Sequence, residues 1–141
     1  MELKVGLLSD SESYYTKEVL FKKLETNKKI KFVDLGVFRE NETYDPQGLG
    51  DRAAQSISDG TCNCCLLISS SGNGLQMYAN KNKHVRAVAC LDTMTATVAI
   101  NEFNANMCDM PQFMPIDKLV KIAETFLETF LQRGSIKNEM E

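Results

Sequence analysis

The segment Ser69-Ser70-Ser71-Gly72-Asn73-Gly74 places three hydroxyl side chains and two glycines directly after the apolar run 64–68. Glycine gives the backbone access to positive φ angles and to close contact with a ligand, and unpaired amides at the start of a helix point toward negative charge. A loop of this composition can hold a phosphate, a carboxylate or an enediolate oxyanion. The segment is predicted to be the end of a strand, an anion-binding loop and the start of a helix.

Apolar strands and amphipathic helices alternate along the chain and predict the frame that positions this loop. The predicted strands are the apolar runs 3–8, 30–35, 64–68, 85–91 and 105–108. Such alternation is typical of a parallel sheet that is covered by helices on both faces. We therefore expect an α/β fold, built as one domain over residues 1–141.

Outside the predicted strands, the sequence predicts a long loop and a final helix. The segment 36–50 contains proline and glycine and is predicted to be a long functional loop, with a helix resuming near Leu49 and running to Ser58. A last helix follows Pro115, because apolar residues recur at spacings of three and four: Leu119, Ile122, Ala123, Phe126, Leu127 and Phe130. Its apolar face is predicted to be core or subunit interface. Residues 133–141 are polar and are predicted to form a flexible tail.

Parallel sheets bind ligands at the carboxyl ends of their strands. We therefore expect Ser9-Asp10-Ser11, Ser69-Ser70-Ser71, Asp92 and the residues after Leu35 to meet at one edge of the sheet. Two structural alternatives stay open. Asp10 can serve only as a helix cap, and the serine- and glycine-rich loop can be a strand-to-helix turn that came with the fold.

Composition excludes several classes of partner. The net charge is -3, and the largest basic cluster is Lys28-Lys29-Ile30-Lys31, so no nucleic-acid partner is expected. No apolar run approaches the roughly 18 residues that cross a bilayer. The five cysteines are odd in number and lie mostly in or beside apolar segments, which favours free thiols and a cytoplasmic location. The cluster 62–65 lacks a second group of ligands for a metal, and His84 is predicted to be a solvent-facing turn residue.

Several short motifs, taken in order, resemble one family: the type B ribose-5-phosphate isomerases together with the two subunits of galactose-6-phosphate isomerase. The motifs are Ser9-Asp10, Asp34-Leu35-Gly36, Ser71-Gly72-Asn73-Gly74, Ala79-Asn80-Lys81, Arg86-Ala87, Ala105-Asn106 and Phe126-Leu127. The resemblance runs from Lys4 to about Phe130. It implies a Rossmann-like three-layer α/β/α sandwich with a five-stranded parallel sheet. It also implies a dimer whose active sites take residues from both subunits.

The resemblance further implies aldose–ketose isomerisation of a sugar phosphate without a metal or organic cofactor. In this reaction a base moves a proton between two adjacent carbons while loop amides stabilise the enediolate. Asp10 matches the family residue that orients sugar hydroxyls, and Ser71 stands where the family has a hydroxyl general acid. The remaining predicted substrate-binding groups are Ser11, Ser70 and the amides of Gly72, Asn73 and Gly74.

The chain departs from the family pattern at most of the reactive positions. Members of the family use one of two alternative bases, and this chain has Ser69 at the position of the first and Leu75 at the position of the second. A serine hydroxyl cannot take a proton from carbon unaided. The other departures are Ser11 and Glu102 for two histidines, Phe103 for an asparagine and Phe113 for a phosphate-binding arginine. At the C-terminus only Arg133 and Lys137 remain as candidate phosphate ligands.

Two hypotheses follow. In the first, the chain is a sugar-phosphate isomerase of the ribose-5-phosphate or galactose-6-phosphate type with a degenerate active site. Its catalytic groups are then Ser69, Ser71 as acid, and Glu102 or Asp10 as base. In the second, the chain is a non-catalytic sugar-binding or structural subunit. The expected partners are a small sugar phosphate and either an identical subunit or a homologous active one.

Overall fold

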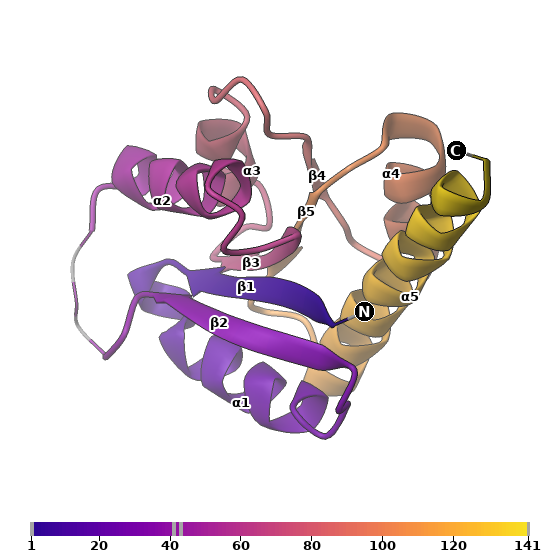
Figure 1. The fold of residues 1–141 in the computed structure, drawn as a ribbon. Helices are drawn as coiled ribbons and strands as arrows, with labels where there is room; N and C mark the ends of the chain where they lie inside the picture. Colours follow the sequence, from indigo (N-terminus) through magenta and orange to yellow (C-terminus); the bar gives the residue numbers. More distant parts are fainter. Residues whose placement is uncertain (1, 41, 43, 141) are drawn as a thin grey trace.

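A five-stranded parallel sheet forms the centre of the computed structural model, which describes residues 2–40, 42 and 44–140 (Figure 1). Its strands are β1 (Leu3–Ser9), β2 (Ile30–Gly36), β3 (Cys64–Ser69), β4 (Ala87–Ala89) and β5 (Met107–Pro111). Their order across the sheet is β2-β1-β3-β5-β4, and every neighbouring pair is parallel. The predicted parallel sheet is confirmed.

Helices cover both faces of this sheet. The helices α1 (Tyr14–Leu24), α4 (Thr93–Phe103) and α5 (Ile116–Met140) pack on one face, and α2 (Pro46–Ser58) and α3 (Gly74–Ala79) pack on the other (Figure 1). A short 3-10 helix, Ser11–Ser13, precedes α1. The architecture is the predicted three-layer α/β/α sandwich.

The central strand β3 shows why this sequence forms such a sandwich. All six of its residues are buried, because helices cover the strand on both sides. Leu66 and Ile68 contribute to the core under α1, α4 and α5, whereas Cys65 and Leu67 contribute to the core under α2 and α3. An uninterrupted apolar run therefore fits this position better than an alternating one.

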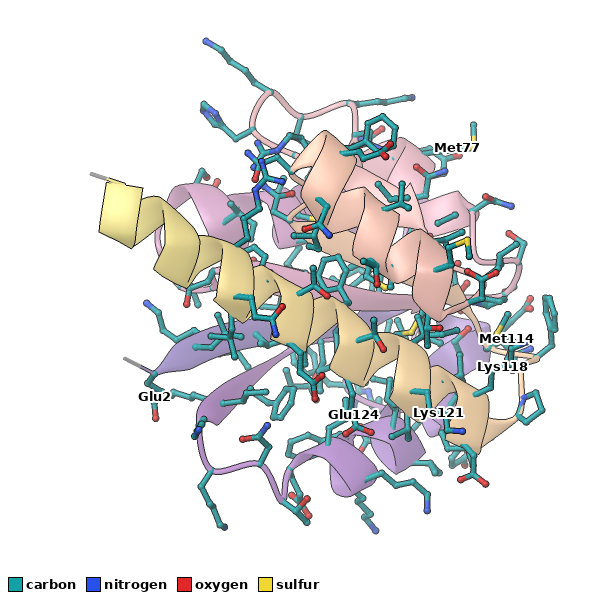
Figure 2. The ribbon with its side chains drawn as sticks, turned by 90° about the vertical axis from the view of Figure 1, so that its right-hand side faces the viewer. Glu2, Met77, Met114, Lys118, Lys121 and Glu124 are labelled. Atoms are coloured by element: carbon teal, nitrogen blue, oxygen red, sulfur yellow. The ribbon has the colours of Figure 1, made fainter. Side chains whose placement is uncertain are left out.

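The helix α5 crosses its face of the sheet between α4 and α1 (Figure 2). The predicted apolar stripe is confirmed as core, since Leu119, Ile122, Ala123, Phe126 and Leu127 are each at most 2% exposed. Lys118, Lys121 and Glu124 lie on the exposed side. The three-and-four spacing thus divides the helix into a buried and a solvated face.

The structure continues α5 to Met140, past the point where the sequence indicated a tail from Arg133. A single glycine inside a helix costs only about 1 kcal/mol, so Gly134 need not end it. Most of the residue types between Ser135 and Met140 are also compatible with the interior of a helix. The flexibility of 133–141 stays a prediction, and Glu141 lies outside the described residues.

The bounds of the two strands at the β4 side of the sheet differ from those predicted. β4 is limited to Ala87–Ala89 instead of 85–91, and β5 begins at Met107 and ends at Pro111 instead of covering 105–108. The side chain of Asn106 accepts a hydrogen bond from the Arg86 amide and donates one to the His84 carbonyl, both at 2.9 Å. This side chain adds to the backbone bond from the Asn106 amide to the Arg86 carbonyl, at 2.9 Å, just before β4 begins.

A glycine brings α2 and α3 into close contact on their face of the sheet. A Cβ atom on Gly50 would lie 2.8 Å from the Ala79 nitrogen and 2.9 Å from the Tyr78 carbonyl carbon. Both atoms belong to the backbone, so neither can turn away. The absence of a side chain at Gly50 therefore sets how closely α3, and the loop in front of it, approaches the rest of the molecule.

Candidate functional site

Three polar segments meet where the central strands end. Ser9 at the end of β1 is paired with Ile68, and Ser69 at the end of β3 is paired with Pro111 of β5. The Asp10 amide continues the ladder by donating to the Ile68 carbonyl at 3.2 Å. The predicted meeting of the segments after β1 and β3 at the carboxyl edge is confirmed.

Asp10 ties two of these segments together. One oxygen of its carboxylate accepts from the Ser13 amide at 3.0 Å, and the other accepts from the Ser70 amide at 2.8 Å. The Ser70 hydroxyl lies 3.0 Å from the same Asp10 oxygen and 2.9 Å from a Glu12 oxygen. Asp10 is thus both the predicted helix cap and a partner of the serine-rich loop.

The segment after β2 reaches the same edge. The Val37 amide donates to the Ser9 carbonyl at 3.2 Å, and Ser11 Oγ donates to the Glu42 carbonyl. Lys17 is 1% exposed, and its Nζ donates to Asp34 Oδ1 at 2.7 Å and to the Val37 carbonyl at 2.5 Å. Sequence reasoning did not single out this buried lysine, which anchors the predicted functional loop from inside the protein.

The loop after β3 is folded upon itself. The Gly72 amide donates to Ser69 Oγ at 3.0 Å, and the Asn73 amide donates to Ser71 Oγ at 3.2 Å. Serine hydroxyls commonly satisfy nearby amides in turns. Two of the three amides that were predicted to hold an oxyanion therefore have partners inside the protein. A bound oxyanion has to replace these hydroxyls.

Gly72 has a φ of +82°, and a Cβ atom there would lie 2.9 Å from Pro111 Cδ and 3.0 Å from Pro111 N. Both the backbone conformation and the space at this position exclude a side chain. The loop consequently lies directly against the end of β5.

A buried carboxylate that the sequence analysis missed lies behind the loop. Asp109 of β5 is 0% exposed, and its Oδ1 accepts from Ser69 Oγ at 2.8 Å. Its Oδ2 accepts from the Gln76 amide at the start of α3, at 2.9 Å. An internal anion therefore occupies the helix start that was predicted to receive a ligand. The signal in the sequence was an acid inside the apolar strand Met107-Cys108-Asp109-Met110.

Burial raises the pKa of Asp109 from 3.8 to about 6. The hydrogen bonds from the Gln76 amide and the Ser69 hydroxyl oppose this shift, while the negative charge of Asp10 adds to it. A carboxyl group with this pKa can change its protonation state near neutral pH.

This shift predicts how stability depends on pH. The native state holds the Asp109 proton more tightly than the unfolded chain, so the Asp109 contribution to the free energy of unfolding is complete below pH 3.8 and is lost as the pH rises through 6. The shift corresponds to about 3 kcal/mol. Urea denaturation of the wild type and Asp109→Asn at pH 4 to 7.5 measures it, and equal pH slopes in the two proteins contradict the prediction.

Glu102 and Arg133 lie at the opposite edge of the sheet from the serine-rich loop of the same chain. α4 begins after Asp92, whose carboxylate caps it by accepting from the Thr95 amide, and ends at Asn104 just before the start of β5. Arg133 donates to the Ile100 and Asn101 carbonyls at the end of α4, at 2.5 and 2.8 Å. Ser69 is paired with Pro111 at the carboxyl end of β5, about 13 Å along the strand from its start at Met107.

The other predicted positions, the side chain of Lys137 excepted, lie among the described residues. Leu75 is 2% exposed and belongs to the core, whereas Phe103 and Phe113 are 61% and 69% exposed. The side chain of Lys137 lies outside the described part of the structure. His84 is exposed in the turn after α3. All five cysteines are buried free thiols.

The described residues contain neither a metal-binding cluster nor a membrane-spanning helix. Within residues 2–40, 42 and 44–140, no group of three or more histidine, cysteine, aspartate or glutamate side chains could hold a metal ion. None of the helices in the same ranges is long and apolar enough to cross a membrane.

The fold and the loop define a parallel α/β protein with a polar site at the carboxyl edge of its sheet. The chain belongs to the Ribose/Galactose Isomerase family, which it matches over residues 5–141. The resemblance noted in the sequence is therefore confirmed, and the chain is a sugar-phosphate isomerase family protein.

Individual relatives agree with this assignment. The chain is 31% identical over 111 residues to D-erythrulose-4-phosphate isomerase 2 of Mycolicibacterium smegmatis, which covers 78% of this chain and 73% of the relative. The ribose 5-phosphate isomerase of Thermotoga maritima has a TM-score of 0.83 and 26% identity, over 90% of this chain and 87% of the other. The Mycoplasma genitalium ribose-5-phosphate isomerase B with bound ribulose-5-phosphate has a TM-score of 0.80 and 25% identity, over 100% and 99%. These relatives give no support to the hypothesis of a non-catalytic subunit.

Proposed function

We propose that this chain catalyses the aldose–ketose isomerisation of a small sugar phosphate at the carboxyl edge of the sheet. The observation that carries the proposal is the meeting of Asp10, Ser69, Ser70 and Ser71 at this edge, in a chain whose relatives are isomerases of four- and five-carbon sugar phosphates. The substrate is then an open-chain sugar phosphate such as erythrulose-4-phosphate, ribulose-5-phosphate or tagatose-6-phosphate.

The reaction needs hydroxyl-binding groups, an acid and a base. Asp10 and Ser70 are polar and bonded to one another, so they form a preorganised pair for sugar hydroxyls. Ser71 is exposed and can reach the oxygen that gains or loses a proton as the carbonyl moves between adjacent carbons. Ser11 and the amides of Asn73 and Gly74 complete the proposed contact surface, while the Gly72 amide stays on Ser69 Oγ.

We also propose that two copies of the chain form a homodimer, or that this chain pairs with a homologous subunit. Glu102 and Arg133 are too far from Ser69 to act with it in the same chain, so a second copy has to supply them. Large exposed apolar side chains support an interface next to the edge strand β4: Met77 at 63%, Leu91 at 50%, Met94 at 74% and Phe103 at 61%. A cytoplasmic location is part of the same proposal, and the buried free thiols support it.

A carbon NMR assay tests the proposed activity. Purified protein is incubated in deuterium oxide with each of the three ketose phosphates, and conversion to the aldose is expected for at least one, with deuterium incorporated at one carbon. Ser71→Ala should slow this conversion by about 10²–10⁴-fold. Lys118→Ala on the exposed face of α5 is the matched control and should leave it unchanged. Failure of the wild type to convert any of the three contradicts the proposal.

A further inference from the structure

Asp109 is the buried acid whose presence the proposed function does not yet explain. A carboxylate is almost never fully buried unless it is paired with a cation or fully hydrogen-bonded, because removing its charge from water is costly. Among the described residues no lysine or arginine forms a salt bridge with Asp109. Its two oxygens are instead held by one hydroxyl and one amide.

The hydroxyl that holds Asp109 belongs to Ser69, the position at which related isomerases have their thiol base. Ser69 Oγ donates its proton to Asp109 Oδ1 at 2.8 Å and accepts from the Gly72 amide at 3.0 Å. A serine with these two partners differs from an isolated serine. Asp109 is positioned to accept the hydroxyl proton, and the Gly72 amide is positioned to stabilise the negative charge that develops on the oxygen.

We propose that Asp109 is the proton acceptor of the isomerisation and that Ser69 relays the proton to it from the substrate carbon. This inference rests on the proposed function. As the carbon–hydrogen bond breaks, its electron pair forms the carbon–carbon double bond, the π pair of the carbonyl moves onto the carbonyl oxygen to give the enediolate, and the proton bonds to Ser69 Oγ. The original Ser69 proton passes to Asp109 Oδ1 in the same step. The reverse transfer returns a proton to the adjacent carbon, so no oxidant or co-reactant is required.

The surroundings of Asp109 suit this role. The negative charge of Asp10, just after β1, acts on it, the Ser69 hydroxyl contacts it from β3, and the Gln76 amide contacts it from α3. On β5 itself the adjacent Cys108 thiol is kept neutral by burial, which raises its pKa. With its own pKa raised to about 6, Asp109 is ionised and ready to accept a proton at neutral pH, yet basic enough to hold it.

Access to Ser69 sets a condition on the mechanism. Ser69 is 1% exposed and Asp109 is 0% exposed, whereas Ser71 and Asn73 in the same loop are exposed. The turn that includes Ser71 therefore has to open for the substrate carbon to contact Ser69 Oγ. Once the substrate is seated there, water is excluded from the acceptor, which strengthens the electrostatic interactions within the pair.

The test compares four proteins with the wild type: Ser69→Ala, Asp109→Asn, the double variant, and Asp51→Asn as a control on the exposed side of α2. Ser69→Ala and Asp109→Asn should each lower kcat by about 10²–10⁴-fold with little change in KM, and the double variant should lose no more than either single one. The logarithm of kcat/KM of the wild type should rise with pH and level off above about 6. Asp51→Asn should keep the wild-type rate and pH profile.

A merely structural Asp109 gives different results. In that case Asp109→Asn lowers the melting temperature but keeps the rise of kcat/KM with pH, or the losses in the two single variants multiply in the double variant. Either result overturns the inference, as does wild-type turnover by Ser69→Ala, which decides the matter even where Asp109→Asn fails to fold. Absence of turnover in the wild type overturns the proposed function itself and is thereby distinguished from failure of the relay.

Discussion

Mixing two inactive variants is expected to restore activity. Ser71→Ala and Glu102→Ala should each lose about 10²–10⁴-fold in turnover, because Ser71 is the proposed acid and Glu102 stands where the resemblance places a histidine that acts in proton transfer. In a dimer that combines one subunit of each kind, one site lacks both groups and the other site retains both. Random exchange of subunits yields mixed dimers in about half of the population, so about a quarter of the wild-type activity should return.

The physical reason is the separation of the two residues within a single chain. Ser71 follows the carboxyl end of β3, whereas Glu102 is in the last turn of α4 near the start of β5. A side chain cannot span the length of a strand, so Glu102 can reach Ser71 only from a second subunit. The measurement is turnover after the variants are unfolded together and refolded, with mass-tagged subunits to count the mixed dimers.

The complementation experiment has a matched control. Ser71→Ala mixed with Ser71→Ala/Glu102→Ala provides no intact site in any combination and should stay inactive. Mixed dimers that form in the expected amount but remain as inactive as the separate variants contradict the shared site. Sedimentation of the wild type at the mass of one 15.8 kDa chain contradicts the dimer.

Replacing Phe126 by alanine is expected to lower the free energy of unfolding by about 3–5 kcal/mol. Phe126 is 0% exposed in the core between the sheet and α5, and its ring stacks on that of Phe130 with centroids 6.5 Å apart. Its removal leaves a cavity between α5 and the sheet that the surrounding side chains fill only in part. The measurement is urea denaturation at a fixed pH.

The control for this substitution is Phe113→Ala, which removes the same ring at a position that is 69% exposed. It should change the free energy of unfolding by no more than about 0.5 kcal/mol. Equal effects of the two substitutions would show that the Phe126 ring is not packed as described.

The periodic pattern of apolar residues predicted most of the fold. β3 and α5 were predicted from the local pattern alone. An unbroken apolar run indicates a strand that is buried on both faces, and apolar residues at spacings of three and four indicate a helix with one buried face. β4 and β5 were misplaced by two or three residues at their ends. Their limits depend on Asn106, whose side chain bonds to Arg86 and His84 about twenty residues away. No local pattern carries that information.

The candidate site divides in a similar way. The sequence by itself determined the parallel α/β fold, the polar loop after β3 and the convergence of Asp10 with Ser70, because strand ends and turn residues follow from local chemistry. Only the tertiary structure decided that Asp109 lies against Ser69, forty residues away, and that Glu102 and Arg133 lie at the other edge. The physical reason is that the register of β3 with β5 and the direction of α4 are set by packing across the whole sheet. Such long-range pairing determines which distant side chains share one site.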